Sequence, residues 1–307
     1  MTTATTTLHS GALRQALLER TRQAVAGGAL HTIETEQRLI VDQGVEFLVR
    51  TVSSLRRKQK DKKRRERAGG ATTNPFLPPE PDLTVGAIGP DHYAVLNKFN
   101  VLENHLLIVT RHFEHQETLL TPADFAALAF CLQEIDGLGF YNGGAEAGAS
   151  QTHKHLQLVP LPLAADLPGT PMEYLFPSDG KAQTPFQLPQ LWFEHRFTRL
   201  DADFWRDCSD VPERLHGLYR NMLGDCGIGE CDGDSLPRQT APYNLLVRRD
   251  WMLLVPRSAE HCGGISINAL GYAGSLFVRN AAEMAFVQRQ GPMRILSAVA
   301  RPLQASA

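Results

Sequence analysis

His153-Lys154-His155-Leu156-Gln157, at the centre of a 307-residue chain, is the stretch that indicates both the fold and the chemistry of the protein. Successive side chains of a strand point to opposite faces, so an extended segment places His153, His155 and Gln157 on one face. Lys154 and Leu156 then lie on the other. In a helix, residues at i, i+2 spacing would stand about 200° apart. The stretch therefore predicts a strand that offers two imidazoles and an amide to one ligand.

The residues before this stretch predict short strands around one helix. Residues 92–99 and 105–110 read as two strands joined by a polar turn, which indicates a hairpin. Thr121 is a helix N-cap followed by proline, and an Ala/Leu-rich helix continues to about Asp136. A short strand at 138–141 and a Gly/Ser-rich loop lead into the histidine strand. The predicted order is two strands, a helix, a strand, a small-residue loop and a strand.

The N-terminal sequence predicts helices followed by a charged loop. Residues 11–25 and 34–55 show a helical spacing of apolar residues. Residues 56–67 carry nine Lys or Arg and two acids, and a Gly- and Pro-rich stretch follows. This basic loop is either a solvated charge run or a flap that closes over a polyanionic substrate.

The C-terminal half also predicts mixed secondary structure. Candidate strands cover residues 191–197, 243–247 and 251–255, and a candidate helix covers residues 212–223. Both halves thus contain a hairpin and a helix. Together they indicate an α+β protein with an antiparallel sheet and flanking helices.

The composition is that of a globular protein without a global charge bias. Hydrophobic residues make up 43% of the chain, and 31 basic against 33 acidic residues give a net charge of -2. Such a balance gives no general attraction to nucleic acid or anionic membranes, so any basic site must be local. The five cysteines form no CxxC pair, and no apolar run approaches about 18 residues. We expect a reduced, soluble, cytoplasmic protein with no nucleic-acid or membrane partner.

Two features suit phosphoryl chemistry: the loop that precedes the histidine strand, and the two imidazoles themselves. Backbone N–H groups of a Gly/Ser loop can cradle phosphate oxygens. A histidine with an ordinary pKa of about 6.5 is largely neutral at pH 7, so one ring nitrogen can attack phosphorus. Gln157 can donate to a phosphoryl oxygen but cannot act as an acid or a base, which favours a transferase over a hydrolase.

Two other interpretations of the histidine pair stay open at this point. An HxH strand can offer two imidazoles to zinc, which then needs a third ligand. The available third ligands, none at a diagnostic spacing, are His105, His112, His115 and Cys262. Alternatively, both histidines belong to an ordinary polar strand face, although the adjacent phosphate-cradling loop argues against this.

Several segments together resemble one protein family. Tyr-Asn-Gly-Gly at 141–144, Gly-Ala-Ser-Gln at 148–151 and the 153–157 stretch resemble, in order and spacing, the diadenosine tetraphosphate phosphorylases, also called ATP adenylyltransferases. These form the transferase branch of the histidine-triad superfamily, in which glutamine replaces the third histidine. The resemblance spans most of residues 45–280. Further matching segments are 74–82, 96–99, 243–257 and 265–274.

The resemblance implies a histidine-triad-like transferase fold and a covalent mechanism. His155 would attack the α-phosphorus of diadenosine tetraphosphate and expel ATP, and inorganic phosphate would then take AMP from the histidine to give ADP. Gln157 would hold a non-bridging oxygen. The resemblance also divides the chain into a catalytic region over residues 1–190, with a helical N-terminus and the basic loop, and an ATP adenylyltransferase region over residues 191–307.

The remaining site residues are implied by position. His153 would be the catalytic neighbour of the nucleophile, and Lys58 stands for a phosphate-binding lysine in the basic loop. The implied substrate-binding residues are Lys58, Asn97, Lys98, Asn142, Gly148, Ala149, Ser150, Gln151, Gln157, Asn244 and Arg257. No protein metal site and no tightly bound cofactor are expected, and Mg²⁺ would accompany the polyphosphate. The expected partners are nucleotides and inorganic phosphate.

Other reactions stay as alternatives. A dinucleoside polyphosphate hydrolase and a sulfate-accepting nucleotidyltransferase belong to the same superfamily. A zinc hydrolase would use the HxH pair, and a nucleotide sensor would bind without turnover. The chain departs from the hexose-1-phosphate uridylyltransferases, because Lys154 stands where they carry proline and their cysteine-based metal sites are missing.

Overall fold

The computed structural model describes residues 5–52, 74–165, 167, 169–177, 183–207, 209–233 and 236–303. Residues 56–67, including Lys58, lie outside this part of the chain. Both interpretations of the basic loop therefore stay predictions.

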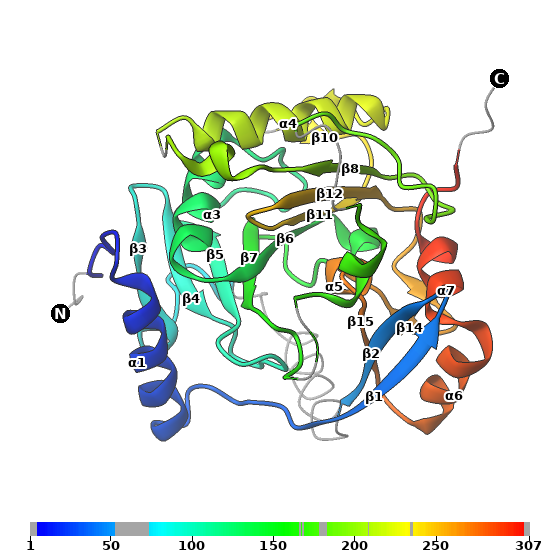
Figure 1. Cartoon of the computed structure of the whole chain (residues 1–307). Helices are drawn as coiled ribbons and strands as arrows, with labels where there is room; N and C mark the ends of the chain where they lie inside the picture. The colour runs from blue at the N-terminus through cyan, green and yellow to red at the C-terminus, as the bar shows by residue number, and fades with distance from the viewer. Residues whose placement is uncertain are drawn as a thin grey trace.

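An eight-stranded sheet forms the centre of the molecule (Figure 1). Every neighbouring pair of its strands is antiparallel. In spatial order the strands are β3 (Thr84–Ile88), β4 (His92–Leu96), β5 (Leu106–Thr110), β7 (His155–Pro160), β6 (Gly137–Gly143), β11 (Tyr243–Val247), β12 (Trp251–Pro256) and β8 (Arg196–Arg199). Because β6 pairs with β11, strands from both sides of residue 190 form one continuous sheet.

The predicted α+β class with an antiparallel sheet is confirmed, as are its best-marked elements. The hairpin predicted from residue 92 onward is β4 and β5. The predicted helix is α3 (Pro122–Glu134), which begins at a capping box: Thr121 accepts the Asp124 backbone N–H, and the Asp124 carboxylate accepts that of Thr121. The helix predicted over residues 212–223 is α4 (Val211–Asp225). Local sequence signals thus located the framework of the sheet.

The predicted helix over residues 34–55 is wrong. Residues 35–52 of this segment form a hairpin of β1 (Thr35–Asp42) and β2 (Val45–Val52). Gln43 and Gly44 have φ of 52° and 81°, as tight hairpin turns require. β1 is mostly exposed, whereas β2 is mostly buried because β15 (Ser275–Val278) pairs with its other edge. Buried and exposed residues do not alternate cleanly in either strand, so the apolar residues of the segment mimic a helical spacing.

The strand predicted over residues 191–197 begins later, at the start of β8. The residues before it pair with the C-terminal segment instead of the sheet. The backbone N–H of Glu194 donates to the Arg301 carbonyl at 2.8 Å, and Phe193 bridges to Pro302. The apolar side chains of this stretch are therefore buried by a long-range contact that the local sequence does not indicate.

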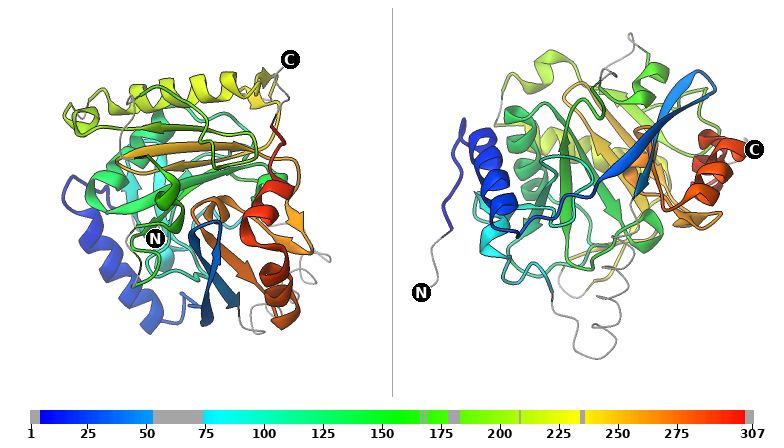
Figure 2. Two further views of the ribbon diagram at one scale, coloured as in Figure 1. Left: turned by 45° about the vertical axis from the view of Figure 1, so that its right-hand side comes forward. Right: turned by 90° about the horizontal axis from the view of Figure 1, so that it is seen from below.

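Helices pack against the sheet and lie on two opposite sides of the molecule. α3 packs against α4 and contacts β6 and β7. α1 (Leu13–Ala26) lies beside the edge strand β3, and α6 (Ala281–Gln290) and α7 (Pro292–Val299) lie on the opposite side of the molecule (Figure 2). The three-stranded sheet β1-β2-β15 lies near α6 and α7.

Two hydrophobic clusters fill the interior. Side chains of β6 and β11 alternate between them: Tyr141 and Leu245 belong to the first cluster, and Phe140 and Leu246 to the second. A central sheet buried on both faces explains why these strands read as nearly continuous apolar runs. The remaining short elements are α5 (Ala269–Tyr272), β9 (Glu230–Cys231), β10 (Arg238–Gln239), β13 (His261–Cys262), β14 (Ile265–Ser266), η1 (Pro81–Leu83), η2 (Ala145–Ala147), η3 (Pro171–Leu175) and η4 (Ala202–Trp205).

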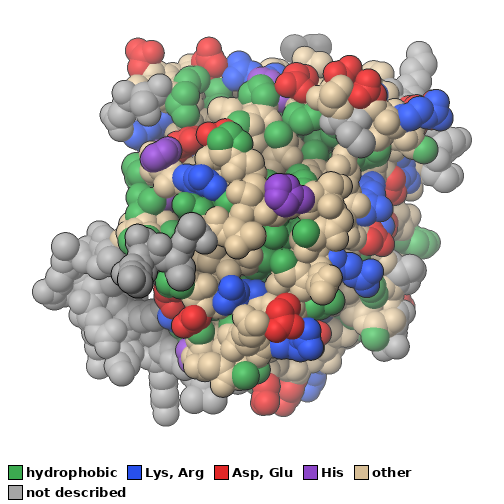
Figure 3. Space-filling view, turned by 90° about the vertical axis from the view of Figure 1, so that its left-hand side faces the viewer, with side chains coloured by type: hydrophobic (Ala, Val, Ile, Leu, Met, Phe, Trp, Pro, Cys, Tyr) green, Lys and Arg blue, Asp and Glu red, His purple; other side chains and the backbone are tan. Residues whose placement is uncertain are grey.

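The surface carries mixed charge. On the face seen in Figure 3, acidic and basic side chains of the described residues are interspersed. This matches the near-zero balance of charged residues in the sequence. Among the described helices, none is both long and apolar enough to span a membrane.

Candidate active site

The sheet register brings polar side chains of three strands onto one face. Asn244 of β11 lies opposite Asn142 of β6, and residues paired across an antiparallel ladder share a face. Phe140, two residues before Asn142, lies opposite Gln157 of β7. His155 precedes Gln157 by two residues and so shares its face. The period of the strands alone therefore gathers these four polar residues on one side of the sheet.

His155 is the first residue of β7 and is only 4% exposed. Its Nδ1 lies 2.8 Å from the carbonyl oxygen of His153. A carbonyl can only accept, so Nδ1 carries the ring proton and Nε2 carries the lone pair. Among the described residues, no group forms a hydrogen bond with Nε2. Burial lowers the pKa of His155 to about 4, so the ring is neutral at pH 7.

His153 lies just before β7, so the strand begins two residues later than predicted. Its Nδ1 accepts from the Asn74 amide at 2.9 Å, and its Nε2 donates to the Thr110 carbonyl at 2.9 Å. The Phe76 ring contacts both imidazoles, with centroid distances of 5.6 Å to His153 and 5.4 Å to His155. Both nitrogens of His153 are thus occupied, and its backbone carbonyl orients His155.

Lys154 lies on the opposite face, as predicted, and is fully buried. Its Nζ is 2.6 Å from the Asp124 carboxylate and 2.9 Å from that of Glu114. Asp124 also accepts from His92 Nε2 at 2.9 Å. Burial raises the pKa of Asp124, but the Lys154 charge and the His92 hydrogen bond outweigh it and hold this pKa well below its usual range. The ion cluster ties the N-terminus of α3 to the segment that carries both histidines.

Gln157 is partly buried, and its amide is held by a second imidazole. Its Oε1 lies 2.9 Å from His105 Nε2. His105 Nδ1 in turn lies 3.2 Å from the Asn97 amide nitrogen. Gln157 therefore shares the face of His155 as predicted, and a contact between Asn97, His105 and Gln157 extends the site toward β4.

Asn142 and Asn244 form a buried amide pair. Asn244 Nδ2 donates to Asn142 Oδ1 and to the Ala147 carbonyl, both at 2.9 Å. Asn142 Oδ1 also accepts the backbone N–H of Ala269 at 3.0 Å. Because a backbone N–H can only donate, the oxygen of Asn142 is fixed toward α5, and its Nδ2 is the end left for a ligand.

Arg257 places a buried positive charge behind this pair. It is 3% exposed, and its guanidinium donates to Asn244 Oδ1 and, at 2.8 Å, to the Ala259 carbonyl. Burial lowers the pKa of Arg257, but a guanidinium stays charged in proteins. No described carboxylate forms an ion pair with it. Its charge is therefore available to stabilise an anion near Ala147 and the loop that follows.

The loop after β6 is shaped by Gly148. Its φ is 88°, and a Cβ there would lie 2.8 Å from the Asn268 side chain and 2.9 Å from the Ile267 carbonyl. Both the conformation and the close approach require glycine. The predicted phosphate-binding residues Ala149, Ser150 and Gln151 follow directly.

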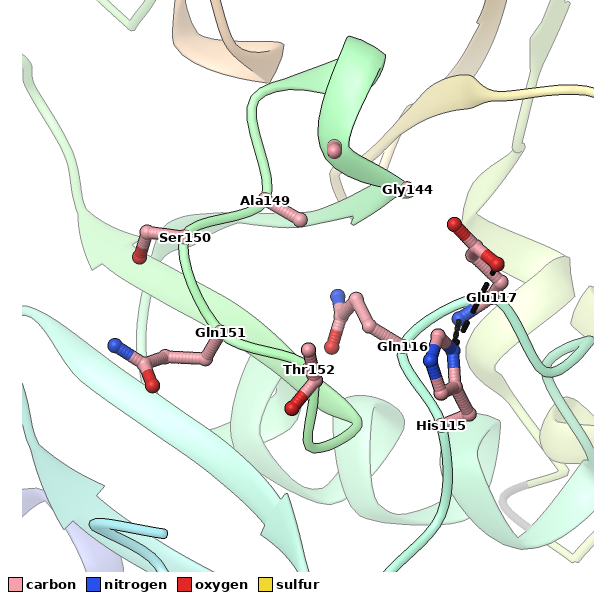
Figure 4. Close-up of a pocket in the computed structure, with 9 residues that line it drawn as sticks. His115, Gln116, Glu117, Gly144, Ala149, Ser150, Gln151 and Thr152 are labelled. Atoms are coloured by element: carbon pink, nitrogen blue, oxygen red, sulfur yellow. Dashed lines mark hydrogen bonds and ion pairs between the residues drawn. The ribbon is translucent and has the colours of Figure 1, made fainter. Parts of the chain in front are cut away.

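A small cavity of about 130 Å³ lies beside this loop. Ala149, Ser150 and Gln151 line one side, and the segment 115–117 lines the other (Figure 4). His115 and Glu117 interact across 3.8 Å, and the Gln116 side chain projects between them and the loop. The cavity therefore borders the predicted phosphate-binding residues.

Gln116 is a site residue for which the sequence gives no signal. Its Oε1 accepts the backbone N–H of His155 at 2.9 Å, and its Nε2 donates to the Asn142 carbonyl at 2.9 Å. The ladder between β6 and β7 ends at Phe140 and Gln157, so this amide replaces ladder bonds where the strands separate. Gln116 and His155 are 39 residues apart, which hides the contact from any local pattern.

Not every predicted binding residue lies with this group. Lys98 forms an ion pair with Glu80 at 2.5 Å, with both side chains partly exposed. Asn97 reaches the group only through His105, and Lys58 is outside the described residues. The structure thus brings together His155, Gln157, Asn142, Asn244 and Arg257.

The zinc interpretation can be compared with the same contacts. The described residues contain no group of three or more His, Cys, Asp or Glu that could hold a metal ion. Of the candidate third ligands, His105 is hydrogen-bonded to Gln157. His153 would have to give up two hydrogen bonds to coordinate a metal.

Comparison with family models gives two matches that together span almost the whole chain. A model described as the Ap4A phosphorylase N-terminal domain matches residues 3–178. A model described as the ATP adenylyltransferase C-terminal domain matches residues 189–302. Ap4A is diadenosine tetraphosphate.

Two similar proteins come from Saccharomyces cerevisiae. Protein APA1 is 28% identical over 233 residues, 67% of this chain and 69% of that protein. A diadenosine tetraphosphate phosphorylase 2 is 27% identical over 241 residues, 69% of this chain and 70% of that protein.

Solved structures share the fold. The crystal structure of yeast Ap4A phosphorylase Apa2 matches with a TM-score of 0.78 at 24% identity, covering 95% of this chain and 98% of that one. The same yeast protein in complex with Ap4A matches with a TM-score of 0.75 at 23% identity, covering 95% and 98%. The predicted transferase-type fold is therefore confirmed.

Proposed function

The chain belongs to the Ap4A phosphorylase family, and from this membership we propose that it is an ATP adenylyltransferase that cleaves diadenosine tetraphosphate with inorganic phosphate. The products are ATP and ADP. The observation that carries the proposal is His155, a buried neutral imidazole with its Nδ1 proton anchored and its Nε2 open to the face that carries Gln157 and Asn142. These features suit a nitrogen nucleophile.

In the first step, Nε2 of His155 attacks the α-phosphorus of the dinucleotide. An N–P bond forms, the bond from this phosphorus to the bridging oxygen breaks, and ATP leaves with that electron pair. A terminal phosphate has a second pKa of about 6, so ATP departs at pH 7 without a proton from the protein. The product is an AMP group on His155.

In the second step, an oxygen of inorganic phosphate attacks the same phosphorus. The N–P bond breaks, ADP leaves, and Nε2 regains its lone pair. Neither step needs a proton acceptor, because phosphate at pH 7 is already an anionic nucleophile. Gln157, an uncharged amide, therefore suffices beside His155, whereas attack by water would call for a general base.

Binding of the polyphosphate rests on local positive charge and oriented N–H groups. The loop from Gly148, the Asn142 Nδ2 and the Arg257 charge supply these on one side of the sheet. Mg²⁺ would enter with the polyphosphate and screen its charge. The cytoplasmic location expected from composition is part of the same proposal.

One experiment tests reaction class, intermediate and acceptor together. The protein is incubated with diadenosine tetraphosphate labelled at the α-phosphates, with inorganic phosphate, with sulfate or with neither. We expect labelled ADP and ATP with phosphate, and labelled protein with little free AMP in its absence. Equal release of AMP in all three arms would indicate a hydrolase. Tight binding with neither products nor labelled protein would indicate a sensor.

A further inference from the structure

Three polar side chains follow one another on the site face of adjacent strands. Asn97 follows β4, His105 precedes β5, and Gln157 belongs to β7. The backbone N–H of Asn97 donates to the His105 carbonyl at 2.9 Å, which continues the β4–β5 ladder. Leu107, two residues after His105, lies opposite Gln157. The three side chains therefore stand side by side.

The first link fixes the ring proton of His105. The backbone N–H of Phe99 faces Asn97 Oδ1 at 3.4 Å, and a backbone N–H can only donate. The other end of the amide, Nδ2, therefore faces His105 Nδ1 at 3.2 Å. Since Nδ2 donates, His105 Nδ1 accepts, and the ring proton lies on Nε2.

The second link fixes the amide of Gln157. His105 Nε2 lies 2.9 Å from Gln157 Oε1 and donates to it. Turning the Gln157 amide over would set two donors against each other at this distance. Its Nε2 is consequently the end that stays free, and no described residue forms a hydrogen bond with it. A backbone N–H at residue 99 thus determines which end of Gln157 faces the ligand.

We propose that His105 is a positioning residue that orients Gln157 with its N–H₂ group toward a phosphoryl oxygen. This inference rests on the proposed function, because it assigns the ligand group that Gln157 meets. A phosphoryl oxygen is negatively charged and needs a donor, while the opposite amide end would present lone pairs to it. Without His105, no other contact with a described side chain selects the donor orientation over the other.

Two substitutions separate this role from a merely structural one. His105→Gln keeps a donor that can reach the position of Nε2, whereas His105→Asn is shorter by one methylene and cannot reach Gln157. Both keep an amide in the same buried place. We expect the asparagine variant to lose about tenfold in kcat/KM for phosphorolysis, the scale of one hydrogen bond, and the glutamine variant to stay within about threefold.

A double-substitution cycle supplies the decisive comparison. In a Gln157→Ala background there is no amide to orient, so His105→Asn should change kcat/KM by less than about twofold. A loss of the same size in both backgrounds would show that His105 acts through stability and would overturn the proposal. So would normal activity of His105→Asn in the otherwise unchanged enzyme. Absence of phosphorolysis in the unchanged protein would instead contradict the proposed function, which is a distinguishable result.

Should His105→Asn unfold, the cycle is run with His105→Gln, which keeps the donor. The prediction is then a small loss that disappears in the Gln157→Ala background. A loss that persists there contradicts the proposal. Thermal unfolding of each variant, followed by circular dichroism, establishes which pair is used.

Discussion

His155 and His195 are two buried imidazoles in nearly the same local setting. Each donates from Nδ1 to the carbonyl two residues earlier, at 2.8 Å for His155 and 2.7 Å for His195. Burial lowers the pKa of each to about 4. They differ at Nε2: that of His195 accepts the backbone N–H of Leu188 at 2.7 Å, whereas no described group forms a hydrogen bond with that of His155.

The difference teaches what distinguishes a candidate nucleophile from a core histidine in this chain. Burial, neutral charge and tautomer are common to both rings, so none of them identifies the site. An open Nε2 does, because only an unshared lone pair can attack phosphorus. His195 also lies among the aromatic rings of the second hydrophobic cluster, next to Phe193, and away from the oriented amides.

The largest expected effect comes from removing each ring in turn. His155→Ala should lower the rate of phosphorolysis at least about a thousandfold, because the nucleophile is lost. His195→Ala should keep the chemistry but lose about 1–3 kcal/mol of stability, because the Leu188 N–H is left without its acceptor. Steady-state kinetics and chemical unfolding of both variants measure this. Similar rates of phosphorolysis for the two variants would contradict the assignment of His155, and not His195, as the nucleophile.

A smaller effect is expected from pH, and here the two histidines should behave alike. Each has a folded pKa of about 4 against about 6.5 when unfolded, so its contribution to stability is complete above pH 6.5 and is lost as pH falls toward 4. Between pH 7 and pH 5 each ring should account for roughly 2 kcal/mol of lost stability. His195→Gln removes the part of this pH-dependent loss of stability that comes from His195.

Urea unfolding at several pH values checks this prediction. The His195→Gln variant should lose less stability than the unchanged protein between pH 7 and pH 5, while its activity at pH 7 persists. An identical pH dependence in both proteins would mean that His195 is not buried in its neutral form.

The smallest effect is expected from removing the Gln116 amide, which positions the backbone of His155. Gln116→Met removes the amide that holds the His155 backbone N–H and the Asn142 carbonyl, and we expect about a tenfold loss in kcat. Gln133→Met, at an exposed position on α3, is the matched control and should be neutral. Equal activity of the two variants would show that the strand end keeps its geometry without the amide.

Local sequence signals predicted the parts of the fold that local physics determines. The N-cap at Thr121 before α3 and the placement of Lys154 opposite the histidines were both confirmed. The hairpin over residues 35–52 was mistaken for a helix, because a strand buried on both faces and an exposed edge strand each lack alternation. Which neighbours a strand has is decided by distant residues.

The same limit applies to the site. The two-residue period of a strand is enough to predict that His155 and Gln157 share a face. Their supports, Gln116 and His105, lie 39 and 52 residues away along the chain, and only the sheet register brings them close. Residue type marks His105 only as one of several possible zinc ligands, and no spacing marks either residue as a partner of the central stretch.

The hydrogen-bond partner of His155 Nδ1 is an uncharged backbone carbonyl, and this has a consequence for the reactivity of the intermediate. An imidazole that keeps its Nδ1 proton while Nε2 bonds to phosphorus becomes a cation, and at Nδ1 it meets a backbone carbonyl instead of a carboxylate. A carboxylate would stabilise that cation, as in the Ser-His-Asp triad. With a carbonyl alone, the adenylyl group stays on a good leaving group. The intermediate would thus be reactive toward the next phosphate, which would remove AMP readily, although without phosphate no general base helps water to attack it.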